Sequence, residues 1–269
     1  MVGMFSNQSA YDRFVDIIRG PDGRIPLAEA ALTIATEFRG GKPIAANLRR
    51  IANWASRCRG MTLNETARYF VEGLGFLGDS KDSAHPRNQL LDSVIESRRG
   101  GPICLGILFM EISVRNGRPL DAISIPGAFL LRQYETGKYV APFFGSQILT
   151  EDQVWRLAQI GSHRENPRNW ERPLRNKQIL LRLLTDLKVA FLERQQYDRA
   201  AAVQEKMLIV NPGRAQEYRD LGVISASAGD LRTACRYLGE YLVRRPDAAD
   251  AMLVRNQLQM MADTAASRN

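Results

Sequence analysis

Hydrophobic residues recur every three to four positions through the first third of the chain, a spacing typical of amphipathic helices. The first such run covers residues 7–19. Pro26 and Pro43 stand where the next two runs begin, as proline often does in the first turn of a helix. A fourth run opens with the capping-box sequence Thr62-Leu63-Asn64-Glu65 and extends to Gly73. This part of the chain is therefore predicted to be helical.

The pattern changes in the middle of the chain. A short helix is predicted at residues 89–96, and the apolar run from Ile103 to Arg115 predicts a buried helix. Three strands are predicted to follow: residues 120–125 alternate in polarity, and residues 129–134 and 139–144 each come after a glycine-containing turn, the last two as a hairpin. Thr150 and Gln153 are placed to cap one more short helix. The fold class predicted for this region is α+β, a helix packed on a small antiparallel sheet.

The last third of the chain repeats itself. Pro212 and Pro246 are 34 positions apart, and the same offset relates Ala200 to Ala234 and Leu208 to Leu242. A period of 34 residues is that of the tetratricopeptide repeat, a pair of packed helices. The sequence therefore predicts an all-α region of two repeats, followed by a capping helix.

A polar stretch separates the two regions. Arg, Asn, Glu and Pro dominate from Ser162 to Lys177, which is typical of a linker. The predicted organisation is an α+β domain with a helical N-terminal part at residues 1–161, a linker at 162–177, and helical repeats at 178–269.

Composition narrows the function classes. The chain has 269 residues, of which 45% are hydrophobic and 25% charged, as in globular proteins. Because no signal peptide or long apolar run is present, we expect a cytoplasmic protein with no membrane span. The net charge of +8 favours acidic partners, but 29 acidic residues interrupt the basic ones, so nucleic acid is the less favoured partner. Three cysteines and two histidines give no disulfide framework and no metal-ligand pattern, and no cofactor is expected.

One glycine motif has a simple structural explanation. Residues 73–78 match the dinucleotide pattern GxGxxG, which binds pyrophosphate only when a strand leads into it and a helix follows. Here a predicted helix leads in and a polar stretch follows. We therefore interpret the motif as the end of a helix.

A second glycine motif is the main candidate for chemistry. Residues 97–102, Ser97-Arg98-Arg99-Gly100-Gly101-Pro102, form a segment that we call the entrance loop, directly before the buried helix. Its glycines are expected to permit unusual backbone angles, and Pro102 suits a first helical position. Cys104 follows, and a thiol at a helix N-terminus can have a lowered pKa.

Taken in order, these landmarks resemble the SirB family of bacterial proteins, in which a transglutaminase-like domain precedes tetratricopeptide repeats. The resemblance covers roughly residues 26–262. The segments that carry it are Leu74-Gly75-Phe76-Leu77-Gly78, Pro86-Arg87-Asn88, Arg98-Arg99-Gly100-Gly101-Pro102-Ile103, Ile125-Pro126-Gly127-Ala128-Phe129-Leu130-Leu131-Arg132, Pro142-Phe143 and Arg219-Asp220-Leu221-Gly222.

The resemblance also implies which residues should be catalytic. A transglutaminase-like site activates a cysteine with a histidine that a carboxylate orients. In this chain Pro102 stands at the nucleophile position, Ala128 replaces the histidine of Pro-Gly-His-Phe, and Ala141 replaces the aspartate of Asp-Pro-Phe. His85 replaces the aspartate of Asp-Pro-Arg-Asn. No catalytic triad is therefore expected, which suggests a pseudoenzyme.

Three functions stay open from the sequence. The favoured hypothesis is a catalytically silent protein-interaction, scaffold or assembly module that binds a protein or peptide partner. The second is a thiol acyltransferase or peptidase that uses Cys104 with His85, although the apolar neighbours of Cys104 favour a core position. The third is a basic adaptor for RNA or another acidic partner. The expected binding residues are Arg87, Asn88, Gly100, Gly101, Pro102 and Ala128, and Arg87 with Asn88 is expected to hold the glycine loop by hydrogen bonds.

Overall fold

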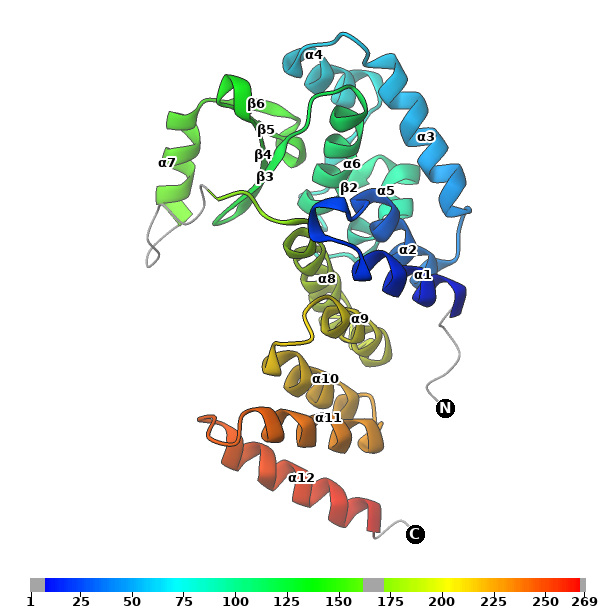
Figure 1. The fold of residues 1–269 in the computed structure, drawn as a ribbon, viewed down its shortest axis with the longest axis vertical. Coiled ribbons are helices and arrows are strands. Elements are labelled where there is room, and N and C mark those ends of the chain that lie inside the picture. The colour runs from blue at the N-terminus through cyan, green and yellow to red at the C-terminus, as the bar shows by residue number, and fades with distance from the viewer. Residues whose placement is uncertain (1–7, 162–171, 267–269) are drawn as a thin grey trace. The chain divides into compact units, whose positions relative to one another are not determined.

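The computed structural model describes residues 8–161 and 172–266 (Figure 1). These residues fall into two compact units, whose boundary lies between Leu183 and Leu184, inside helix α8 (Asn176–Leu192). We call residues up to Leu183 the first unit and residues from Leu184 onward the repeat unit. The predicted fold class is confirmed, since an α+β part is followed by an all-α part.

The first unit begins with the predicted helices. They are α1 (Gln8–Arg19), α2 (Leu27–Arg39), α3 (Ile44–Arg57) and α4 (Leu63–Arg68). The capping box of α4 is complete, because the Thr62 N–H donates to Glu65 Oε2 at 2.7 Å and the Glu65 N–H donates to Thr62 Oγ1 at 3.3 Å. The sequence pattern thus sets both the position and the start of this helix.

The helix that begins with α4 closes in an unexpected form. Its last turn, Tyr69–Gly73, is a π-helix, which the sequence analysis did not predict. Gly73 is required there because a Cβ at this position would overlap the ring of Tyr69. Gly75 then adopts a φ of +76° and ends the turn. The GxGxxG segment is therefore a helix end, as predicted.

Short elements connect this turn to the buried helix. Strand β1 (Leu77–Gly78) pairs in parallel with β2 (Arg99–Gly100), and neither strand was predicted. The predicted helix at 89–96 corresponds to helix α5 (Leu91–Ser97), and a 3-10 turn at Pro86–Gln89 precedes it. Helix α6 (Pro102–Arg115) is buried along most of its length, as its apolar sequence predicts.

The sheet has four antiparallel strands in sequence order. They are β3 (Asp121–Ile125), β4 (Ala128–Gln133), β5 (Lys138–Ala141) and β6 (Gln147–Leu149). The third predicted strand was too long, because residues 142–144 form a 3-10 turn that starts at Pro142. Strand β6 was not predicted, since three residues are too few to show alternation.

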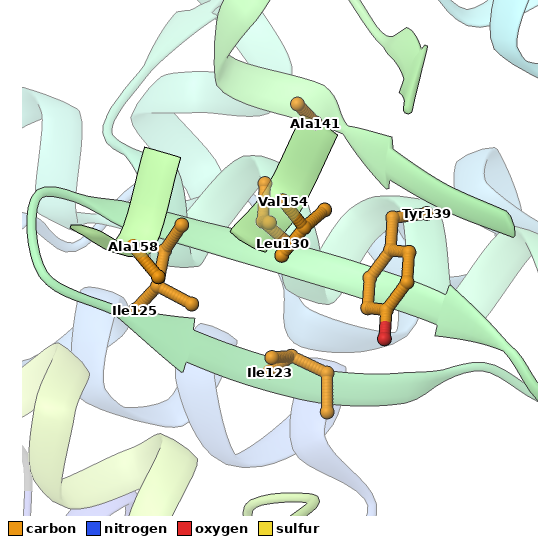
Figure 2. Packing of buried hydrophobic residues seen from close by; sticks show 7 residues of the cluster. All are labelled: Ile123, Ile125, Leu130, Tyr139, Ala141, Val154 and Ala158. Carbon is orange, nitrogen blue, oxygen red and sulfur yellow. The ribbon is translucent and has the colours of Figure 1, made fainter. Parts of the chain in front are cut away.

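Different helices cover the two faces of this sheet (Figure 1). Phe129 on β4 packs on α6, where a Cβ at Gly106 would overlap its ring. Side chains alternate along a strand, so Ala128 and Leu130 face the other way. Figure 2 shows the cluster on that second face, where the strands meet α7 (Glu151–Gly161) through Val154 and Ala158.

The repeat unit consists of packed helices with the predicted period. After α8 come α9 (Tyr197–Val210), α10 (Ala215–Ser227), α11 (Leu231–Arg244) and α12 (Ala251–Ala266). Helices α9 and α11 begin 34 residues apart, as the repeat requires. Gly222 lets α10 approach α11 closely, since a Cβ there would lie 2.6 Å from Leu238 Cγ. The tetratricopeptide prediction is confirmed.

Helix α8 begins at Asn176, two residues before the predicted start of the repeats. Its first N–H groups are capped by the carboxylate of Asp22, which accepts from the Asn176 N–H at 3.2 Å and the Lys177 N–H at 2.9 Å. A carboxylate is a favourable partner for a helix N-terminus. Most of the predicted linker, residues 162–171, lies outside the described residues.

Candidate functional site

Backbone hydrogen bonds place the entrance loop against two neighbouring segments. The Leu77 N–H donates to Arg98 O at 3.0 Å, and the Asp79 N–H donates to Gly100 O at 3.2 Å. On the other side, the Gly101 N–H donates to Asn88 O at 2.8 Å. The structure therefore brings Asn88, Gly100 and Gly101 together, with Pro102 as the first residue of α6.

The two glycines of the loop have a different role from the expected one. Neither adopts a left-handed backbone, and Gly101 has a φ of −75°. A Cβ at Gly100 would lie 2.6 Å from Val94 Cγ1, and one at Gly101 would lie 2.7 Å from Gln89 Oε1. Close packing, not unusual backbone angles, explains both glycines. The left-handed residue of the loop is Arg98, with a φ of +61°.

Arg87 and Asn88 support a different segment from the one expected. The Asn88 side chain, which is fully buried, donates to Asp79 Oδ2 at 3.1 Å and to Asp82 O at 2.7 Å. Arg87 Nη2 also donates to Asp79 Oδ2, at 3.3 Å. The hydrogen bond from Asn88 is the main reason that the pKa of Asp79 is lowered. Asn88 contacts the glycine loop through its backbone carbonyl, which accepts from the Gly101 N–H, and its side chain bonds to Asp79 and Asp82 instead.

Cys104 lies in the interior, as its neighbours predict. It is the third residue of α6, has no exposed surface and forms no disulfide. A cysteine nucleophile has to meet its substrate, and reactive cysteines are partly exposed. The position therefore suits a small core residue better than a nucleophile.

His85 lies at the start of the 3-10 turn that contains Arg87 and Asn88. Its Nδ1 accepts a hydrogen bond from the Arg87 N–H at 3.1 Å. A neutral imidazole that accepts at Nδ1 carries its proton on Nε2, so its basic nitrogen is already in use. This geometry is that of a capping residue and does not favour a general base.

The positions equated with the catalytic histidine and aspartate face the α7 side of the sheet. Ala141 is a buried member of the apolar cluster there (Figure 2). The half-buried Ala128 packs against the same cluster. The opposite face, where Phe129 meets Gly106, is the one that α6 covers. The two alanines therefore place no catalytic group on the sheet. Ala128 also takes no part in the hydrogen bonds that join Asn88 to the glycine loop.

A second polar cluster was missed in the sequence analysis. It consists of Arg50 on α3, Tyr69 in the π-helical turn, and Arg98 in the entrance loop. The sequence holds one indication of this cluster: Arg98 stands directly after α5, at a position where glycine is usual. It becomes visible only when the end of α5 is known.

Two further properties of the described residues concern metal binding and membrane insertion. Within them, no group of three or more His, Cys, Asp or Glu side chains could hold a metal ion. No helix in the described parts of the chain has the length and apolar character needed to cross a membrane.

Comparison with known families agrees with this architecture. The model of the transglutaminase-like superfamily matches residues 42–185, and a tetratricopeptide-repeat model matches residues 187–259. The chain therefore belongs to the transglutaminase-like superfamily, in a form that carries tetratricopeptide repeats.

Individual relatives confirm the resemblance to the SirB family. A UPF0162 protein of Xylella fastidiosa strain Temecula1 is 31% identical over 198 residues, covering 71% of this chain and 70% of the relative. A UPF0162 protein of Vibrio cholerae is 28% identical and covers 72% and 74%. Protein SirB1 of Salmonella typhimurium is 27% identical over 176 residues and covers 64% and 65%. No solved structure matches the chain.

Proposed function

We propose that the transglutaminase-like domain is catalytically silent and that the chain acts as a protein-interaction, scaffold or assembly module. The observation that carries this proposal is the placement of Ala128 and Ala141. Both alanines pack in an apolar cluster on the α7 side of the sheet, whereas Cys104 is a fully buried residue of α6. A catalytic thiol needs an imidazole within hydrogen-bond reach, and the imidazole needs a carboxylate to orient it; these positions offer neither group.

The repeats supply the interaction that the proposal requires. Tetratricopeptide units present extended surfaces that bind other proteins. We take the partner to be a protein or peptide and place the chain in the cytoplasm. We keep the domain boundaries predicted from the sequence, 1–161, 162–177 and 178–269.

The predicted binding residues divide into two groups. Asn88, Gly100 and Gly101 are buried, and they support the entrance loop from within. Arg87 is exposed, and Pro102 and Ala128 are half-buried. A peptide at this loop would therefore contact Arg87 or Pro102 directly, and would depend on the buried residues only through the shape of the loop.

The proposal is tested by partner capture from the native host with three variants. We expect Cys104→Ser and His85→Ala to capture the same partners as the unmodified chain. We expect Gly222→Val to lose them, because its side chain would displace Leu238 between α10 and α11. Circular dichroism and unfolding curves check that each variant is folded.

The opposite pattern would support the enzyme hypothesis. If a folded Cys104→Ser variant no longer supported the chain's function in the host, while partner capture was unchanged, the thiol would have a chemical role. If Gly222→Val kept every partner, the repeats would not be the interaction surface.

A further inference from the structure

Arg98 has an unusual backbone for its residue type. Its N–H donates to Val94 O at 2.9 Å and closes α5, and the residue is left-handed, with φ +61° and ψ +15°. Glycine is the usual residue at this place after a helix, because a Cβ is disfavoured there. A strained backbone at a residue with a large side chain suggests that the side chain has a use.

The guanidinium of Arg98 is held by aromatic rings. Its Cζ lies 4.3 Å from the ring centroid of Trp54 and 4.6 Å from that of Phe76. The two rings pack edge to face and are themselves almost completely buried. Cation–π contact with two rings holds the guanidinium in place without using its N–H groups as hydrogen-bond donors.

This guanidinium has no counter-charge within the described part of the chain. Arg98 Nη1 is covered and has no hydrogen-bond partner there. Neither Arg98 nor Arg50 forms an ion pair with a described residue, and Arg50 lies over the same Trp54 ring, with its Cζ 5.5 Å from the centroid. Burial is the main cause that lowers the pKa of Arg98, and the charge of Arg50 lowers it further. Two like charges are thus placed close together.

Tyr69 adds a third donor. Its hydroxyl oxygen is covered and has no partner among the described residues, like Arg98 Nη1. The π-helical turn sets its position, since the Leu74 N–H donates to Tyr69 O at 2.8 Å and the ring packs on Gly73. π-helical turns occur frequently at functional sites. The adjacent Phe70 stacks on Phe76, the ring that Arg98 lies over, with 4.8 Å between the ring centroids, so Tyr69 lies near Arg98.

We propose that Arg50, Tyr69 and Arg98 form a binding site for a small oxyanion, the phosphate or carboxylate group of a ligand. The cluster offers two positive charges and a hydroxyl donor, and such a set is completed by an anionic acceptor. The planar guanidinium of Arg98 matches the paired oxygens of a phosphate or carboxylate. This site is independent of the proposed silence of the triad positions.

Calorimetric titration of the full chain tests the site. Inorganic phosphate is titrated in one series and acetate in another, both in a buffer low in other anions. We expect saturable binding, and the anion with the lower Kd identifies the group that the site prefers. Arg98→Gln and Arg50→Gln should each raise that Kd at least about tenfold, because each removes a charged donor. Arg99→Gln, at the exposed neighbour of Arg98, should leave the Kd unchanged.

Tyr69→Phe keeps the test valid if an arginine variant fails to fold. It removes only the hydroxyl group and keeps the ring packed on Gly73, and we expect the Kd to rise by about threefold to tenfold. The proposal is wrong if neither anion shows saturation up to about 10 mM, ten times a millimolar Kd. It is also wrong if Tyr69→Phe binds as tightly as the unmodified chain, or if Arg99→Gln weakens binding as much as Arg98→Gln does.

Discussion

The interior of the repeat unit differs in polarity from the α7 side of the sheet in the first unit. In the repeat unit, Lys188 Nζ donates to Gln204 Oε1 at 2.8 Å, and Gln204 Nε2 donates to Glu217 Oε2 at 2.7 Å. Gln204 and Glu217 are both buried. In the sheet of the first unit, the positions that the family resemblance assigns to polar catalytic groups hold Ala128 and Ala141. The comparison indicates that the buried polar groups of this network in the repeat unit satisfy one another, whereas Ala128 and Ala141 belong to an apolar surface.

The strongest test of this contrast introduces a carboxylate at a triad position. We expect Ala141→Asp to lower the free energy of unfolding by about 4 kcal/mol, because the charge would enter the apolar cluster without a partner. Urea unfolding at pH 7 measures it. Ala128→His should lower the free energy of unfolding by less, because Ala128 is half-buried at the start of β4. An Ala141→Asp variant as stable as the unmodified chain would mean that this position is open to water.

The converse change removes polarity from the repeat unit. Gln204→Leu should cost about 3 kcal/mol, since it leaves Lys188 and Glu217 without their shared partner. Gln216→Leu, at a half-buried position next to Glu217, serves as the control and should change stability little. If Gln204→Leu were neutral, the network would contribute nothing to folding.

Glycines in two helices allow a smaller comparison. Gly106→Ala should cost about 2 kcal/mol, because the added methyl group would overlap Phe129 on the α6 face of the sheet. Gly239→Ala in α11 should stabilise the chain by up to about 1 kcal/mol, because nothing lies near its Cβ and alanine favours a helix. Thermal unfolding of both variants measures the difference. Equal changes in melting temperature would show that Phe129 packs less closely on Gly106 than the structure indicates.

The smallest effect concerns a buried carboxylate in the first unit. Burial raises the pKa of Asp92, and it outweighs the opposing effect of Arg39. A raised pKa means that the folded state holds the proton more tightly than the unfolded state, so Asp92 costs stability as the pH rises above about 4. Asp92→Asn does not titrate. Its stability relative to the unmodified chain should therefore improve between acid and neutral pH, and a difference that stayed constant or moved in the other direction would contradict the raised pKa.

Local signals in the sequence predicted much of the fold. The 34-residue offset, the capping box at Thr62 and the prolines before α2 and α3 act within one element or between neighbouring elements, so they are visible without the structure. Strand β6 and the π-helical turn were missed, because three residues are too few to show alternation and the turn depends on how Tyr69 packs on Gly73.

The candidate site was less predictable, for a physical reason. Alternation shows that Ala128 and Leu130 share a face of the sheet, but it does not show which helix covers that face. The glycines of the entrance loop were expected to adopt unusual angles, whereas their neighbours Val94 and Gln89 explain them. Arg50, Tyr69 and Arg98 are far apart in the sequence and meet only in the folded chain.

The alkylation rate of Cys104 in the folded chain tests the central claim, a silent transglutaminase-like domain, most directly. Iodoacetamide labelling followed by mass spectrometry gives separate rates for the three cysteines. Cys104 and Cys58 are buried and Cys235 is half-buried, and burial also raises the pKa of Cys58. We predict that Cys235 reacts first and that Cys104 reacts only after unfolding. Labelling of Cys104 ahead of Cys235, slowed by His85→Ala, would contradict the account and establish an activated thiol.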